Sequence, residues 1–117
     1  MKILITGGTG FIGSNLCIYL INDGHTVFCL DNNFTGNLYN ISSIKNYENF
    51  SYIYHDVLNP LELDTDIDQI YHLACPASPP KYQADSIYTS KVCYIGTLNM
   101  LEFARKKKCK NITYLNL

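Results

Sequence analysis

The chain has 117 residues, of which 47% are hydrophobic and 16% charged, and a formal net charge of −1 at pH 7. This length and hydrophobic content predict one globular domain over residues 1–117, with enough apolar surface to form a core. The small net charge gives no reason to expect a nucleic acid or an acidic membrane surface as a partner. No apolar run approaches the length of a membrane span, so no membrane association is expected.

The cysteines and histidines indicate which cellular compartment and which kinds of site to expect. The five cysteines are an odd number without paired or metal-like spacing: Cys17, Cys29, Cys75, Cys93 and Cys109. The chain opens directly on an apolar strand pattern, with no signal peptide before it. We therefore expect reduced, mostly buried thiols and a cytoplasmic location. The three histidines lack ligand spacing, so no metal site is predicted.

The first predicted strand is the apolar run over residues 3–5, and a glycine-rich turn into a helix follows it. Gly7 suits the tight turn, Gly10 lets the backbone approach a diphosphate, and Gly13 lets the helix pack closely on its strand. The free N–H groups and the positive dipole end at the helix start form an anion site. This glycine pattern indicates a dinucleotide-binding turn because it lies between a predicted strand and a predicted helix.

A helix is predicted from about residue 11 to residue 24, and a second strand over residues 26–30 ends at Asp31. Asp31 lies 18 residues after Gly13, close to where an acid binds the adenosine ribose hydroxyls. The alternative is that Asp31 merely caps the end of a strand. Two asparagines follow it, with no Arg or Lys to pair with a 2′-phosphate, so the sequence predicts NAD rather than NADP as the cofactor.

The remaining elements alternate as a doubly wound α/β fold requires. They are a polar loop with a short helix around 41–47, strands over 51–55, 69–73 and 112–117, and a long helix over 84–108. Three prolines at 76–80 predict a stiff, exposed loop after the fourth strand. The basic cluster over 105–110 complements the helix dipole, the alternative being a binding patch. Right-handed crossovers predict a Rossmann-type parallel sheet with strand order 3-2-1-4-5.

The assembled segments resemble the extended short-chain dehydrogenase/reductases, the NAD-dependent epimerase/dehydratase superfamily. The whole superfamily shares the turn over residues 6–13, TGGTGFIG. Within it the chain is most similar to the UDP-glucuronate decarboxylases, also called UDP-xylose synthases, through the proline-rich stretch over residues 72–83, HLACPASPPKYQ. The likeness extends to residues 31–32, 34–36, 55–57 and 95–101. It covers the whole chain but only the amino-terminal part of a family member.

The resemblance implies a set of cofactor-binding residues at the carboxyl ends of the strands. Backbone groups would hold the pyrophosphate at Gly7, Gly10, Phe11 and Ile12, with Gly13 completing the turn. Asp31 would bind the adenosine ribose, surrounded by Asn32, Phe34, Thr35 and Gly36. Adenine would lie against Asp56 and Val57, and the path to the nicotinamide against Leu73, Ala74 and Pro76. Ser78 and Tyr82 would face the sugar substrate, the alternative for their loop being a rigid surface turn.

The family reaction shows which residues this chain lacks. NAD oxidises the sugar C4 hydroxyl, carbon dioxide leaves, and NADH reduces the ketone, with a Ser or Thr and a Tyr-x-x-x-Lys pair as proton partners. Here Asn116 and Leu117 stand where the hydroxyl residues are expected, and no Tyr-x-x-x-Lys follows. Tyr88 and Lys91 have the wrong spacing and lie before the fifth strand. Cys93 replaces the Asn that usually ties this helix to neighbouring backbone.

Two functions are left open. The chain is either the NAD-binding portion of a UDP-glucuronate decarboxylase-like carboxy-lyase, truncated before the catalytic residues and inactive alone, or a non-catalytic NAD-binding or dimerising module. In the first case a UDP-sugar becomes a partner only when a complementing chain supplies the catalytic half. In the second, homodimers are expected, because the helix over 84–108 helps to build the dimer interface in the family. The uncovered fifth strand predicts a tendency to aggregate.

Overall fold

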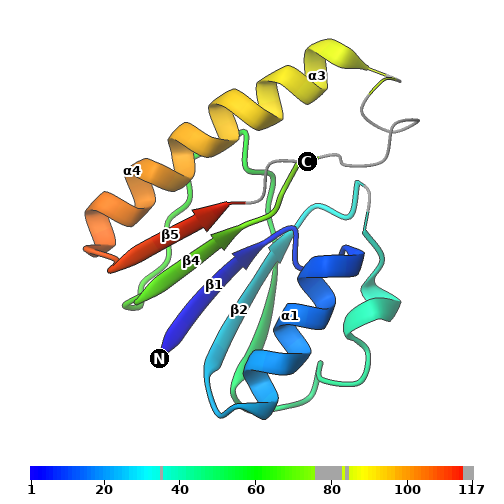
Figure 1. Cartoon of the computed structure of the whole chain (residues 1–117), viewed down its shortest axis with the longest axis vertical. Helices are drawn as coiled ribbons and strands as arrows, with labels where there is room; N and C mark the ends of the chain where they lie inside the picture. Colours follow the sequence, from blue (N-terminus) through cyan, green and yellow to red (C-terminus); the bar gives the residue numbers. More distant parts are fainter. Residues whose placement is uncertain (35, 76–82, 84, 115–117) are drawn as a thin grey trace.

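The computed structural model of the protein describes residues 1–34, 36–75, 83 and 85–114. These residues form one parallel sheet with the strand order β3-β2-β1-β4-β5 (Figure 1). The strands are β1 (Lys2–Thr6), β2 (Thr26–Asp31), β3 (Phe50–Tyr54), β4 (Gln69–His72) and β5 (Asn111–Tyr114). The predicted fold class and strand order are confirmed, and β5 is an edge strand. The predicted proline loop and the last three residues lie outside the described part.

Helices cover both faces of the sheet (Figure 1). The first face carries α1 (Phe11–Asn22) and the short 3-10 helix η1 (Leu38–Ile41); the second carries α3 (Ser86–Lys91), the π-helical segment η2 (Val92–Gly96) and α4 (Thr97–Lys107). The predicted short helix around 41–47 is wrong. The side chain of Asn37 accepts a hydrogen bond from the backbone of Tyr39 at 2.9 Å, which caps a helix that begins earlier and ends at Ile41.

The predicted long helix is a helical run interrupted by a π-helical turn that the sequence pattern did not indicate. The Thr97 hydroxyl donates to the backbone carbonyl of Cys93 at 2.6 Å, four residues earlier. A side-chain donor in this position competes with the i→i−4 backbone bond and widens the helix locally. Gly96 ends the turn with no side chain, which leaves room for the Val57 side chain against it. The turn thus brings the helix close to the segment that follows β3.

The core consists of two apolar clusters, one on each side of the sheet. β1 shows why: Ile3 and Ile5 belong to the cluster beneath α1, whereas Leu4 belongs to the cluster beneath α4. All three are fully buried, because alternate side chains of a strand point to opposite faces. The second cluster also takes Met100 and Phe103 from α4. The consecutive apolar residues of β1 therefore reflect helices on both faces.

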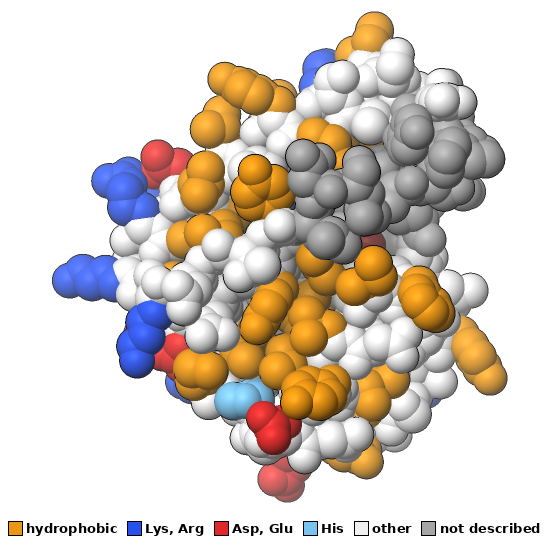
Figure 2. Space-filling view, viewed as in Figure 1, with side chains coloured by type: hydrophobic (Ala, Val, Ile, Leu, Met, Phe, Trp, Pro, Cys, Tyr) orange, Lys and Arg blue, Asp and Glu red, His pale blue; other side chains and the backbone are white. Residues whose placement is uncertain are grey.

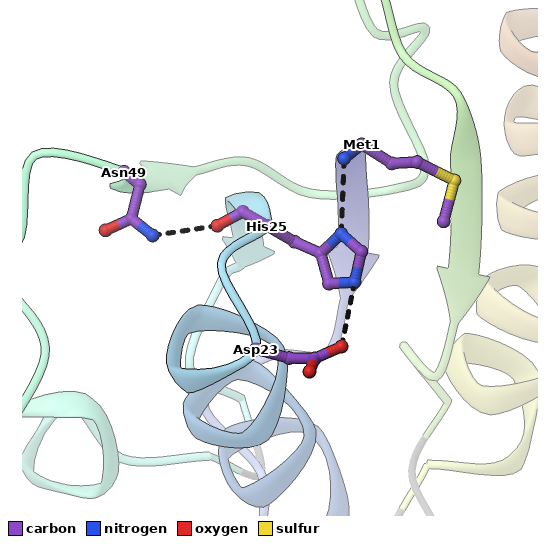
Figure 3. A network of polar contacts seen from close by, with 4 residues as sticks. All are labelled: Met1, Asp23, His25 and Asn49. Carbon is purple, nitrogen blue, oxygen red and sulfur yellow. Dashed lines mark hydrogen bonds and ion pairs between the residues drawn. The ribbon is translucent and has the colours of Figure 1, made fainter.

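The amino-terminal edge of the sheet is held by His25 (Figure 3). Its Nδ1 lies 3.2 Å from the amino group of Met1, and its Nε2 lies 3.2 Å from Oδ2 of Asp23. An ammonium group only donates, so Nδ1 accepts and Nε2 carries the proton given to Asp23. The carbonyl of His25 also accepts from the Asn49 side chain at 2.8 Å. This network joins the start of β1 to the turn between α1 and β2, and it lies opposite the edge where ligands bind in this fold.

The expectation that all five thiols are reduced is wrong for two of them. Cys75, after β4, forms a disulfide with Cys93 in η2, with a Cα–Cα distance of 5.8 Å. Cys17 and Cys29 are free and buried, and Cys109 is free and half-buried. Spacing along the chain could not reveal the pair, because only the packing of η2 beside the end of β4 brings these residues together. Among the described residues, no helix is long and apolar enough to cross a membrane.

Candidate functional site

The glycine-rich turn joins three strands at the carboxyl edge of the sheet. Gly7 has a φ of +72°, and its amide donates to the carbonyl of Leu30 at 2.8 Å, at the end of β2. A Cβ on Gly7 would lie 2.7 Å from the carbonyl carbon and oxygen of Leu73, after β4. Only glycine accepts both this φ and this approach. The turn is therefore held between the residues that end β2 and those that follow β4.

The start of α1 has the properties of an anion site. Gly10 is the N-cap residue, and no side chain caps the helix within the described part of the chain. A Cβ on Gly13 would overlap the carbonyl oxygen of Gly7, so the first turn of α1 packs directly on the glycine turn. A Cβ on Gly10 would meet no protein atom nearer than 3.4 Å, so the space beside it is open. Phe11 and Ile12 are 83% and 47% exposed, and the uncapped amides keep their capacity to bind an anion.

Asp31, at the end of β2, is fixed by the same turn. Its Oδ2 accepts from the backbone amide of Thr9 at 2.9 Å and from the Thr9 hydroxyl at 2.6 Å. Its Oδ1 accepts from the amide of Asn33 at 2.8 Å. A carboxylate offers about four lone-pair positions, so Asp31 keeps acceptor capacity for a ligand hydroxyl. Gly36 packs against Thr9, where a Cβ would overlap the threonine hydroxyl.

An aromatic contact joins the segment after β2 to α3. The rings of Phe34 and Tyr88 are tilted, with centroids 5.0 Å apart. The side-chain amide of Asn32 donates to the Tyr88 hydroxyl at 3.3 Å, and its Oδ1 accepts from the amide of Phe34 at 3.0 Å. Phe34 is 44% exposed. Tyr88 therefore holds two of the residues that the family resemblance places around the adenosine ribose.

The segment after β3 presents mainly backbone. The side chain of Asp56 accepts from the amide of Leu58 at 2.9 Å, which closes a turn. Val57 is 5% exposed and packs beneath Gly96, so it could meet an adenine ring mainly through its backbone. The Val57 carbonyl accepts from the Asn99 side chain at 2.8 Å. The predicted contact of this segment with an adenine ring therefore depends on how α4 holds the segment in place.

A directed chain of hydrogen bonds holds the end of β4. The Thr6 hydroxyl accepts from the amides of Leu73 at 3.1 Å and Ala74 at 3.2 Å, so its own proton goes to Nδ1 of His72 at 2.7 Å. His72 Nε2 then donates to the Thr97 hydroxyl at 3.2 Å. Burial lowers the pKa of His72 to about 4, so the ring is neutral at physiological pH. The network fixes Leu73 and Ala74, the residues expected to line the path to the nicotinamide.

The structure thus brings together most of the residues predicted to bind a cofactor. Thr35, Pro76, Ser78 and Tyr82 lie outside the described residues, as do Asn116 and Leu117. The sequence prediction missed the supporting residues Thr6, Thr9, His72 and Tyr88. Thr9 lies within the glycine turn and could have been suspected there, whereas the contact of Tyr88 joins residues 56 positions apart. No group of three His, Cys, Asp or Glu side chains in the described ranges could hold a metal ion.

Comparison with known proteins decides the family. The sequence model described as GDP-mannose 4,6 dehydratase matches residues 4–116. The chain belongs to this family. It is 52% identical over 105 residues to UDP-glucuronic acid decarboxylase 1 of Danio rerio, a match that covers 90% of this chain and 25% of the relative. The chain therefore spans about a quarter of the length of that curated relative, and the resemblance to UDP-glucuronate decarboxylases is confirmed.

Solved structures of similar fold include dTDP-glucose 4,6-dehydratases and UDP-sugar 4-epimerases. dTDP-glucose 4,6-dehydratase from Bacillus anthracis, solved in complex with NAD, has a TM-score of 0.79 and 29% identity, covering 97% of this chain and 36% of that one. DesIV, a dTDP-glucose 4,6-dehydratase from Streptomyces venezuelae with NAD bound, has a TM-score of 0.86 and 23% identity. That match covers 96% of this chain and 38% of DesIV. At this identity the match to DesIV shows a shared fold.

Proposed function

We propose that residues 1–117 form the NAD-binding portion of a UDP-glucuronate decarboxylase-like nucleotide-sugar enzyme. The observation that carries the proposal is the uncapped start of α1 on the glycine turn, with Asp31 held beside it by Thr9. This arrangement offers donors for a pyrophosphate and acceptors for ribose hydroxyls on one surface. The 52% identity to a UDP-glucuronic acid decarboxylase supports the same function.

The residues present fit NAD better than NADP. The open space at Gly10 and the exposed Phe11 and Ile12 leave room for a diphosphate at the helix start. The remaining acceptor capacity of Asp31 suits the 2′-hydroxyl of an adenosine ribose, whereas a 2′-phosphate would face a carboxylate. When bound, NAD would supply the hydride acceptor for oxidation of a sugar hydroxyl. The residues of this chain would bind and orient it.

We further propose that these 117 residues do not decarboxylate UDP-glucuronate on their own. Hydride transfer at a sugar hydroxyl needs a proton partner with a suitable pKa within about 3 Å, and such partners contribute roughly 10²–10⁴ in rate. The sequence contains no Tyr-x-x-x-Lys pair. His72 is buried and neutral, with both ring nitrogens hydrogen-bonded. A UDP-sugar is therefore a partner of this chain only where other residues complete the site, and carbon dioxide release by the purified chain would contradict this.

A thermal unfolding scan with NAD or NADP tests the cofactor proposal. NAD at 100 times its dissociation constant should add about 2.7 kcal/mol, which raises the midpoint by roughly 10 °C in a domain of this size. Asp31→Asn should lose most of this shift. Asp23→Asn is the matched control, because Asp23 lies at the amino-terminal edge of the sheet and its side chain is 62% exposed (Figure 3). A scan indifferent to NAD, or raised equally by NADP, would refute the proposal.

The alternative, a dimerising module, is favoured by one observation on the second helical face. Ile87, Tyr94, Leu98 and Leu101 are between 46% and 69% exposed. Figure 2 shows hydrophobic side chains over this helical segment, with basic side chains at the α4 end. An exposed apolar stripe of this kind is typical of a protein interface. We propose a second copy of this chain as its occupant: light scattering should give a dimer that Leu98→Asp dissociates, and a monomeric wild-type chain would rule this out.

A further inference from the structure

The disulfide between Cys75 and Cys93 lies beside the proposed nicotinamide end of the site. Cys75 follows Leu73 and Ala74 directly, and its amide donates to the Leu73 carbonyl at 2.9 Å. Cys93 lies 18 residues later, in η2 on the second helical face. The bond is therefore a covalent tie between the end of β4 and the helix that packs over it. A tie here acts on the same backbone that the Thr6 and His72 network holds.

Exposure makes this disulfide accessible to exchange. Cys93 is exposed and Cys75 is half-buried. An exposed disulfide is open to attack by an external thiolate, and such bonds are the ones that exchange readily. The bond thus joins a residue on the surface to a half-buried residue next to the proposed ligand-binding backbone.

The other three cysteines do not compete for this exchange. Cys17 and Cys29 are both fully buried. A hydrogen bond with Cys17 and burial raise the pKa of the Cys29 thiol far above its usual range, so it stays protonated. Burial also raises the pKa of Cys109, whose thiol lies 3.1 Å from the carbonyl of Ile67. Since the thiolate is the reactive form, exchange is confined to the Cys75–Cys93 pair.

We propose that the Cys75–Cys93 bond is a thiol–disulfide exchange site for dithiol reductants, and that its reduction weakens dinucleotide binding. The proposal rests on the proposed NAD-binding function. In the exchange, a thiolate of the dithiol attacks Sγ of Cys93, and Cys75 leaves as a thiolate and takes a proton. The second thiolate of the dithiol then attacks the mixed disulfide and releases Cys93. The protein gains two thiols, and the dithiol is oxidised to its disulfide by two electrons.

The position of the disulfide in the fold explains why its reduction should weaken NAD binding. After reduction no covalent bond joins the end of β4 to η2, and the hydrogen bonds from His72 to Thr97 and from Thr97 to Cys93 remain. Leu73 and Ala74 then sample more conformations, and ordering them on binding costs conformational entropy. We expect the dissociation constant for NAD to rise about tenfold, within the range typical of coupled sites.

Three readouts test the proposal on the purified chain equilibrated with reduced and oxidised dithiothreitol. Maleimide labelling after unfolding should count three free thiols in the oxidised chain and all five in the reduced one. Amide hydrogen exchange at Leu73 and Ala74 should accelerate on reduction. NAD titration should show the tenfold loss of affinity. Cys109→Ser is the matched control, because it removes a free thiol and should leave the redox response unchanged.

Variants at position 93 separate the effect of the disulfide from other effects of the redox buffer. Cys93→Ser should bind NAD as weakly as the reduced chain under both conditions. Cys93→Asn, which also removes the bond, should likewise bind NAD weakly and ignore the redox buffer. A disulfide that never forms, one that dithiothreitol cannot open in the folded chain, or equal NAD affinity in both states overturns the proposal. Absence of NAD binding in both states refutes the proposed function instead, and amide exchange then still decides whether the bond orders the end of β4.

Discussion

The buried His72 predicts a loss of stability in mild acid. Its pKa is lowered from 6.5 to about 4, because burial disfavours the charged ring. Between these two values the unfolded chain binds a proton at this residue and the folded chain does not, so acidification favours unfolding. The stability contributed by neutral His72 is complete above pH 6.5, falls as the pH drops towards 4, and falls no further below that.

The magnitude follows from the same two values. The full difference corresponds to about 3 kcal/mol, and lowering the pH from 7.5 to 5 should remove about 2 kcal/mol through His72 alone. Little of this is lost to solvent screening, because the residue is only 5% exposed. In a domain whose total stability is typically about 5–15 kcal/mol, this change is easily measured.

Urea unfolding of the wild-type chain and of His72→Gln at both pH values isolates the effect, since all other titrating groups are common to the two proteins. The wild-type chain should lose about 2 kcal/mol more than the variant on acidification. Equal losses would show that His72 does not titrate as its burial requires. Should the variant fail to fold, an NMR titration of the His72 ring decides the question: a midpoint near 6.5 refutes the reasoning.

Three further pairs of substitutions test the packing and the site. Gly13→Ala should destabilise the fold by about 2 kcal/mol or more in urea unfolding, because the new methyl group overlaps a backbone oxygen. Gly10→Ala should leave stability nearly unchanged yet weaken NAD binding in a titration. Equal stabilities of the two variants would contradict the assigned packing of Gly13. Tyr88→Ala should weaken NAD binding several-fold, measured by calorimetry, while Tyr88→Phe, which keeps the ring contact with Phe34, should retain most of the affinity. An alanine variant with wild-type affinity would exclude a role of Tyr88 in holding the NAD-binding segment. Met100→Ala should lower the free energy of unfolding by about 2–5 kcal/mol, whereas Leu101→Ala, at a 46% exposed position, should lower it by under 1 kcal/mol. Similar losses for the two variants would mean that α4 packs on the sheet through another face.

Local patterns in the sequence were enough for the strand order and for the position of the glycine turn. Apolar runs, glycines at a strand end and alternation of strands with helices are properties of neighbouring residues, so they can be recognised along the chain. For the same reason Asp31 could be placed near the turn, since its distance along the chain from Gly13 is set by one helix and one strand. The 3-10 helix was misplaced because a single capping bond, from the amide of Tyr39 to Asn37, decides where it starts.

The sequence by itself therefore determined the fold class and the family, and it supplied the residues that we propose to hold a dinucleotide. Only the tertiary structure decided how those residues are held: Thr9 on Asp31, Tyr88 on Asn32, and the hydrogen-bonded chain through His72. It also paired Cys75 with Cys93, where spacing had indicated free thiols. The physical reason is that these contacts join residues between 18 and 66 positions apart, and their geometry depends on how helices settle on the sheet. Local propensity specifies elements, whereas long-range packing specifies which side chains meet.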